Sequence, residues 1–246
     1  KVQSGGGSGG SGGFDLKKFI AEAVGTACLT FVACGGAQEG GAAIAFGFTF
    51  IAMAYTIGSI SGCHINPAVS LCFLIKKKMS PCDFGVYIGA QFLGGIVGSF
   101  LLGLCRRGKW TNLYSNVIAD WLKNPGNNGK NYGKKDGWYY VDGLLVEIIL
   151  TFIFVFVYQG ATDKKVYEGK HAGIIIGIAL ALVCNMGCGY TNGSFNPARS
   201  LGPALLEWFE KNDPYNNEAI KQIWVFFIGP LAGGALSGLA YDALLG

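Results

Sequence analysis

Residues 62–70 read GCHINPAVS and residues 192–200 read NGSFNPARS. The tripeptide Asn-Pro-Ala therefore occurs twice, 130 residues apart, in a chain that is otherwise mostly apolar. Asn is a favoured N-cap residue, and Pro is favoured in the first helical turn, where its missing N–H would have had no partner. Each tripeptide thus predicts the start of a helix. The six residues concerned are Asn66, Pro67, Ala68, Asn196, Pro197 and Ala198.

The composition indicates a protein that crosses a membrane several times. The chain has 246 residues, of which 51% are hydrophobic and only 14% are charged, whereas soluble domains average about 25% charged residues. A helix needs about 20 apolar residues to cross the roughly 30 Å hydrocarbon core of a bilayer. Six stretches meet this length, at approximately 16–36, 41–60, 84–105, 142–160, 171–190 and 221–244. The first thirteen residues, KVQSGGGSGGSGG, are a flexible Gly/Ser linker or the remnant of an artificial fusion, outside the fold.

Two further apolar stretches, near 66–75 and 197–209, each begin with Asn-Pro-Ala. They are too short to span a bilayer, so we expect re-entrant half-helices. One half-helix follows the second span and the other follows the fifth, which makes an internal repeat. The two repeats cover about 14–105 and 142–246 and are joined by a long loop at 106–141. Because each repeat has three spans, the second enters from the opposite face. The expected fold is therefore an all-α membrane protein with six transmembrane helices and two half-helices in an inverted repeat.

The segments before the two half-helices, 61–65 and 191–195, are expected to be non-helical backbone at membrane depth. Such backbone is tolerated only where it is buried or lines a wet cavity. Its carbonyl groups would offer acceptors to passing water, and the side chains of Asn66 and Asn196 would offer donors. The positive ends of both helix dipoles would face the same cavity and would form a barrier to cations. The alternative interpretation is that each Asn only caps its helix.

Three ionisable residues are expected within the membrane. Arg199 directly follows the second motif, and a charge at this depth is a functional hypothesis by default; the alternative is an arginine that extends to the surface. Glu22 and Glu147 occupy matching places in the two repeats. They serve either as a proton relay or as acceptors for loop N–H groups. The chain has only two histidines and no evident relay partners, which favours the bracing role.

Other classes of function find little support in the sequence. The net charge of +4 is scattered, so we expect no nucleic-acid partner. Eight cysteines fall without metal-ligand spacing, and no nucleophile–base pair is evident. We therefore expect no enzyme, no catalytic residue, no metal and no cofactor. A secondary transporter shares inverted repeats and broken helices, but it would need ionisable coupling residues at the midplane. A structural or adhesive membrane protein is supported only by the long basic loop.

The motif contexts SGCHINPAV (61–69), NPARSLGPA (196–204) and GPLAGGALSGLAYD (229–242), together with Glu22 and Glu147, resemble the aquaporin (major intrinsic protein) family. The resemblance extends over residues 14–246. It implies a passive water channel that excludes ions and protons, in a cell membrane, built as a homotetramer with one pore in each protomer. It also implies that the two glutamates brace the pore loops.

The resemblance further implies which residues contact the permeant. The narrow outer filter corresponds to Phe46, Cys184, Gly193 and Arg199, and the pore-lining loops contribute Cys63, His64 and Ser194. Strict water channels have His where Cys184 stands, so the opening is expected to be wide unless a side chain of the 106–141 loop fills it. Ammonia, hydrogen peroxide and urea become candidate permeants. The alternative is a glycerol or small-solute facilitator, but Phe46 in place of Trp, Ser200 in place of Asp and Ala204 in place of a basic residue favour water.

Overall fold

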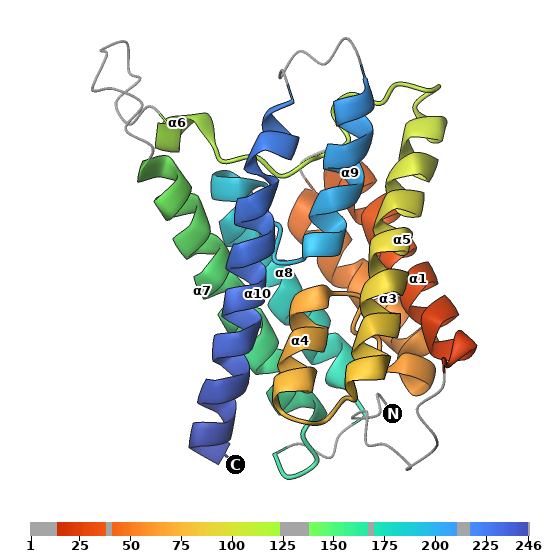
Figure 1. Ribbon diagram of the computed structural model, residues 1–246, viewed down its shortest axis with the longest axis vertical. Coiled ribbons are helices and arrows are strands. Elements are labelled where there is room, and N and C mark those ends of the chain that lie inside the picture. Colours follow the sequence, from red (N-terminus) through yellow and green to blue (C-terminus); the bar gives the residue numbers. More distant parts are fainter. Residues whose placement is uncertain (1–13, 38–40, 124–137, 167–169, 211–216, 246) are drawn as a thin grey trace.

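The computed structural model describes residues 14–37, 41–123, 138–166, 170–210 and 217–245, and within these ranges all regular structure is helical. The Gly/Ser linker predicted at 1–13 and part of the 106–141 loop lie outside the described residues. Six helical segments are long and apolar enough to cross a membrane (Figure 1). They are Leu16–Gly36 (α1, Leu16–Cys28; η1, Leu29–Ala33; α2, Cys34–Gly36), α3 (Ala42–Ser61), α5 (Pro81–Cys105), α7 (Trp138–Thr162), α8 (Ala172–Thr191) and α10 (Glu218–Leu245).

The prediction of six spans and two half-helices is confirmed. The half-helices are α4 (Pro67–Ile75) and α9 (Pro197–Phe209), and a short helix, α6 (Asp120–Lys123), lies in the long loop. The spans differ from the predicted bounds by a few residues at their ends. The third span begins at Pro81 rather than 84 because Ser80 caps it, with its Oγ accepting a hydrogen bond from the Asp83 N–H at 3.0 Å. The protein is an integral, multi-pass membrane protein.

The two repeats pack in the same way. In the first repeat α1 lies along α5, in the second α7 lies along α10, and α3 pairs with α8 between the repeats. α1 begins and α10 ends at one face, here termed the N-terminal face, while α6 and the segment before it lie at the opposite face, the far face (Figure 1). The half-helices enter from these two faces, and their N-termini meet in the interior.

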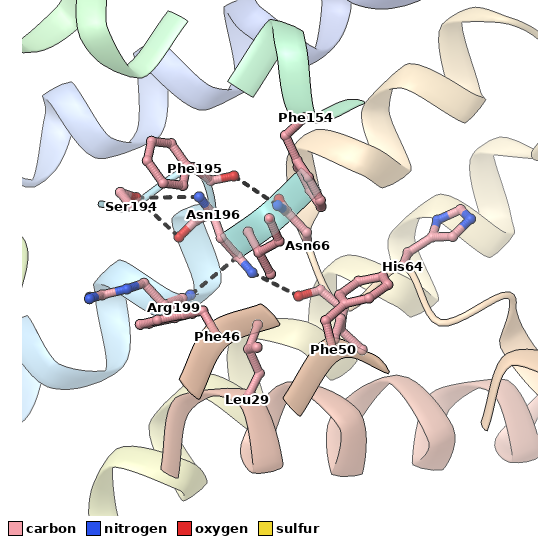
Figure 2. Close-up of a pocket in the computed structure, with 12 residues that line it drawn as sticks. Leu29, Phe46, Phe50, His64, Asn66, Phe154, Ser194, Phe195, Asn196 and Arg199 are labelled. Atoms are coloured by element: carbon pink, nitrogen blue, oxygen red, sulfur yellow. Dashed lines mark hydrogen bonds between the residues drawn. The ribbon is translucent and has the colours of Figure 1, made fainter. Parts of the chain in front are cut away.

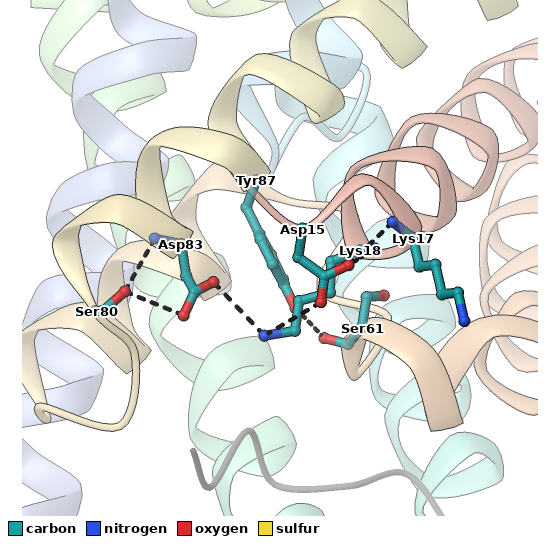
Figure 3. Close-up of polar contacts among 7 residues, drawn as sticks. All are labelled: Asp15, Lys17, Lys18, Ser61, Ser80, Asp83 and Tyr87. Atoms are coloured by element: carbon teal, nitrogen blue, oxygen red, sulfur yellow. Dashed lines mark hydrogen bonds and ion pairs between the residues drawn. The ribbon is translucent and has the colours of Figure 1, made fainter. Parts of the chain in front are cut away.

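Polar contacts fasten the first repeat at the N-terminal face (Figure 3). Lys18 on α1 forms an ion pair with Asp83 on α5, at an N–O distance of 3.5 Å. Deeper in the fold, the Tyr87 hydroxyl donates to the carbonyl of Ser61 at 2.6 Å. This second contact joins α5 to the last residue of α3, where the chain leaves the helix and enters the pore loop.

The first span contains a π-helical turn, η1, in its C-terminal half. Thr26 Oγ1 donates to the Glu22 carbonyl at 2.8 Å, and Thr30 Oγ1 donates to the Thr26 carbonyl at 2.9 Å. Hydroxyl bonds to the carbonyl four residues earlier bend helices, and π-turns within helices are frequent at functional sites. The turn carries Leu29, which lines the interior cavity described below.

Lys76 anchors the C-terminal end of α4 although its side chain is only 3% exposed. Its Nζ lies 2.8 Å from the carboxylate of Asp242 on α10 and 2.8 Å from the side-chain carbonyl of Gln159 on α7. It also lies 4.0 Å from the centre of the Tyr241 ring. A cation beside the last helical carbonyls is favoured by the helix dipole. The short helix is thus tied at this end to two full spans.

Glycines permit each half-helix to approach a full span at backbone distance. A Cβ at Gly95 of α5 would lie less than 3.0 Å from the carbonyl oxygen of Ala198, and a Cβ at Gly234 of α10 would lie less than 3.0 Å from that of Ala68. Both contacts involve the Ala of an Asn-Pro-Ala motif. Both repeats therefore contain the same contact between a glycine of a span and the Ala carbonyl of a half-helix. This contact fixes the depth of the two helix tips.

We expect Gly95→Ala and Gly234→Ala each to destabilise the protein by about 1–3 kcal/mol, because the added methyl group forces α9 or α4 away from its span. Thermal unfolding of the detergent-purified protein measures the effect. Gly85→Ala is the matched control, since a Cβ at this position in α5 meets no atom within 4 Å. Equal melting temperatures for the three variants would contradict the prediction.

Candidate functional site

The tips of the two half-helices are joined by reciprocal hydrogen bonds (Figure 2). Asn66 Nδ2 donates to the Phe195 carbonyl at 2.7 Å, and Asn196 Nδ2 donates to the Ile65 carbonyl at 2.8 Å. Each Asn also caps its own helix: its Oδ1 accepts from the N–H of Ala68 at 2.8 Å in α4 and of Ala198 at 3.0 Å in α9. An amide nitrogen carries two N–H donors, so one donor of each Asn remains for a molecule between the tips.

Glu22 holds the first pore loop in place. The carboxylate is completely buried in α1 and accepts hydrogen bonds from the backbone N–H groups of His64 at 2.9 Å and Ile65 at 2.6 Å. It also accepts from Ser61 Oγ at 2.6 Å and from Gln91 Nε2 at 2.8 Å. Buried N–H groups without partners are costly, and this carboxylate satisfies two of them in a loop that has no regular structure.

Glu147 performs the same task in the second repeat. It is equally buried in α7 and accepts from the backbone N–H groups of Ser194 at 3.1 Å and Phe195 at 2.8 Å. The Thr191 hydroxyl donates to it at 2.7 Å. These contacts are the ones that a bracing role requires. The paired positions of the two glutamates in the sequence thus correspond to paired hydrogen-bonding patterns in space.

Several carbonyl groups of the first pore loop already accept hydrogen bonds from the protein. The Ser61 carbonyl accepts from Tyr87, the Gly62 carbonyl from the Tyr158 hydroxyl at 2.9 Å, and the Ile65 carbonyl from Asn196. A carbonyl oxygen has two lone pairs, so each of them retains capacity for a second donor. The loop carbonyls are thereby fixed in direction by contacts within the protein itself.

A cavity lies between the helix tips and the surrounding spans (Figure 2). Its walls are largely apolar, and a few polar side chains converge on it, as is usual for small-molecule sites. Its lining residues are Leu29, Phe46, Phe50, His64, Ile65, Asn66, Phe154, Leu180, Ser194, Phe195, Asn196 and Arg199.

Arg199, in the first turn of α9, is fully buried and lines the cavity (Figure 2). Its Nη1 donates to the side-chain oxygen of Asn116 and its Nη2 to the Asn192 carbonyl at 3.3 Å. The guanidinium carbon lies 5.1 Å from the centre of the Phe46 ring and 5.5 Å from that of Tyr114. Its Nε has no hydrogen-bond partner among the described residues. A buried donor without a partner is rare in proteins and is available to an oxygen atom of a small molecule in the cavity.

Asn116 and Tyr114 come from the loop after α5, the segment that the sequence indicated as a possible source of a side chain beside Cys184. The loop is held over the far end of the cavity by hydrogen bonds to three helices. Leu113 N–H donates to Glu207 of α9 at 2.6 Å, Ile118 N–H to Gln222 of α10 at 2.7 Å, and Asn116 Nδ2 to the Thr191 carbonyl of α8 at 2.8 Å. Neither residue stands in a recognisable motif, so sequence reasoning identified only the loop.

The remaining residues expected at the filter lie beside Arg199 but not all on the cavity wall. Cys184 is 1% exposed, and Gly193 has a left-handed φ of 58°. A Cβ at Gly193 would lie 3.4 Å from the Cys184 sulfur, so the two residues are neighbours. Cys184 is absent from the described lining. Its contact with the permeant remains a prediction from the resemblance.

The residues expected in the pore loops divide in the same way. His64 and Ser194 line the cavity, whereas Cys63 is fully buried and is not among the lining residues, so its place on the pore remains a prediction. His64 Nδ1 lies 3.1 Å from the Ser70 hydroxyl, and the ring packs against the aromatic ring of Phe73 at a centroid distance of 4.6 Å. Among the described residues there is no group of three His, Cys, Asp or Glu side chains that could hold a metal ion.

Comparisons with known proteins agree with this architecture. The family model described as "Major intrinsic protein" matches residues 13–241. Aquaporin Z of Rhodopseudomonas palustris is 37% identical over 241 residues, which cover 94% of each chain. Aquaporin Z of Bradyrhizobium diazoefficiens is 36% identical over 238 residues, or 92% of each chain. The solved structure of the aquaglyceroporin from Plasmodium falciparum superposes with a TM-score of 0.76 at 21% identity, covering 94% of this chain and 96% of the other, which supports the fold.

We expect Glu22→Gln and Glu147→Gln to destabilise the protein by about 1–3 kcal/mol each, because an amide N–H₂ would replace an acceptor that faces buried backbone N–H groups. Thermal unfolding in detergent measures this loss. Glu210→Gln, at the C-terminal end of α9, controls for the change of charge. If both variants have the same melting temperature as the Glu210→Gln control, the carboxylates do not brace the loops.

Proposed function

Because the chain belongs to the major intrinsic protein family, we propose that it is a passive water channel that excludes ions and protons. One observation carries the proposal. The buried guanidinium of Arg199 keeps an unpartnered Nε–H beside a cavity that also receives the amide groups of Asn66 and Asn196. Water molecules in single file have fewer hydrogen bonds to other water molecules than in bulk. Fixed donors such as these replace the lost hydrogen bonds.

The exclusion of cations is supported by the distribution of positive charge. Arg199 carries a full charge at one end of the cavity. The N-termini of α4 and α9 bring the positive ends of their dipoles to its centre, where Asn66 and Asn196 are located. A cation entering this region would be repelled by these charges, and no carboxylate among the described residues stands on the cavity wall to coordinate it, because Glu22 and Glu147 lie outside the lining and direct their oxygens at loop N–H groups. Such electrostatic barriers are a general means of selectivity in pores.

The permeant is proposed to be water rather than glycerol because two aromatic rings flank Arg199. Phe46 and Tyr114 both lie within 5.5 Å of the guanidinium carbon. Tyr114 also hydrogen-bonds to Cys188, next to Cys184 and Gly193, and we infer that its ring reduces the space that these two small residues leave. The alternative is a glycerol or small-solute facilitator, and the small size of these two residues favours it. Ammonia, hydrogen peroxide and urea are proposed as additional neutral permeants.

A proteoliposome panel separates these permeants. We expect osmotic water flow well above that of empty liposomes, with little glycerol uptake and no ion current. Tyr114→Ala should raise glycerol permeability by about tenfold relative to water, because the pocket beside Arg199 would then accept a larger solute. Tyr139→Ala, in the first turn of α7, is the control for loss of an aromatic residue. Glycerol uptake as fast as water flow in the unchanged protein would establish the facilitator instead.

We also propose that four copies assemble in the membrane, each with its own passage, as the family resemblance implies. The exposed apolar side chains of the spans, among them Ile44, Phe48 and Leu182, suit contact with lipid or with a neighbouring copy. Native mass measurement of the detergent-extracted protein tests the number of chains.

A transport role is proposed in place of any enzymatic one, because the family consists of channels.

A further inference from the structure

Two thiols meet beside the filter. The sulfur atoms of Cys184 and Cys188, one turn apart on α8, lie 3.2 Å from each other, and neither residue is in a disulfide. Both border the space left by Gly193, whose missing Cβ would lie 3.4 Å from the first sulfur and 3.3 Å from the second. Cys188 is partly exposed and hydrogen-bonds to Tyr114, the residue whose ring lies next to Arg199. The proposed water channel assigns Cys184 to the filter but gives no role to the two thiols as a pair.

The helical spacing of the pair disfavours a disulfide. Side chains at positions i and i+4 of a helix have Cβ atoms about 5–6 Å apart, whereas a disulfide requires about 3.5–4.5 Å. A direct bond between Cys184 and Cys188 would therefore distort α8 near the pore loop. An atom placed between the sulfurs lengthens the bridge and removes this conflict. The geometry suits a ligand that binds both thiols at once.

We propose that Cys184 and Cys188 form a two-thiol binding site for trivalent arsenicals. Trivalent arsenic is pyramidal and binds two sulfur atoms on adjacent sides. The sulfur atoms of Cys184 and Cys188 already lie side by side, 3.2 Å apart. Zinc sites need four ligands, and no third His, Cys, Asp or Glu joins the pair among the described residues. Soft cations such as Cu(I) and Hg²⁺ prefer two sulfurs on opposite sides. Trivalent arsenicals are also neutral, so the charge of Arg199 does not repel them.

The reaction is a ligand exchange that needs no oxidant. With phenylarsine oxide, both S–H bonds break and two S–As bonds form. The oxygen of the arsenical takes both protons and leaves as water. Arsenic remains trivalent and neither sulfur is oxidised. The product is a ring closed through one turn of α8, with the phenyl group directed into the space beside Gly193, so that it obstructs the filter if the proposed function is correct.

The full-length protein in detergent is incubated with phenylarsine oxide, washed with excess glutathione, and weighed by intact-protein mass spectrometry. We expect one arsenical per chain to survive the monothiol wash and to be released by 2,3-dimercaptopropanol. Cys184→Ser and Cys188→Ser should each weaken retention by at least about 100-fold, because binding through two thiols gains affinity from effective concentration. Cys105→Ser, at the exposed end of α5, should retain the arsenical.

Retention that persists in either single variant would overturn the proposal, since the arsenical would then be held elsewhere. Loss of the arsenical from the unchanged protein during the glutathione wash would also overturn it, and this result does not depend on the folding of any variant. Because the readout is mass, the inference stands or fails separately from water transport. Osmotic flow measured on the same samples then reports whether the bound arsenical closes the passage.

Discussion

The structure depends on hydrogen-bond partners for non-helical backbone groups that lie in the middle of a membrane. Two loops leave their helices at this depth, and hydrocarbon offers no partner for their N–H groups. The carboxylates of Glu22 and Glu147 supply the missing acceptors from neighbouring spans. Because each loop is fixed in this way, Asn66 and Asn196 reach across to the opposite loop. The polar tips are therefore rigid before any permeant enters, which is the condition for fixed hydrogen bonding along a passage.

Close packing transmits this constraint to the rest of the fold. Gly95 and Gly234 allow the half-helices to lie directly against α5 and α10. The buried ammonium of Lys76 secures the C-terminal end of α4 to two spans. A short helix has little intrinsic stability, because most helical stability in proteins comes from tertiary packing. Its position is accordingly set by glycine contacts at one end and by a charge at the other.

The proposed filter differs from the central site in being assembled from distant segments. Arg199 comes from the second half-helix and Phe46 from the second span. Asn116 and Tyr114 come from a loop that is itself held by side chains of α9 and α10. A change in this loop would therefore alter the size and polarity of the filter without touching either Asn-Pro-Ala motif. The thiol pair on α8 borders the same space.

The sequence by itself determined the spans, the half-helices, the inverted repeat and the central residues. The length of apolar stretches, Pro at helix starts and repeated motifs are local or periodic patterns. They can be recognised in the sequence without knowledge of the three-dimensional structure. Only the tertiary structure decided that Tyr114 and Asn116 meet Arg199, and that Asn66 and Asn196 each donate to a carbonyl of the opposite loop. The backbone has a positive φ at Tyr114, Ile65 and Phe195, where these contacts are made. Such turns are set by packing and hydrogen bonds between segments far apart in the chain, which no local pattern encodes.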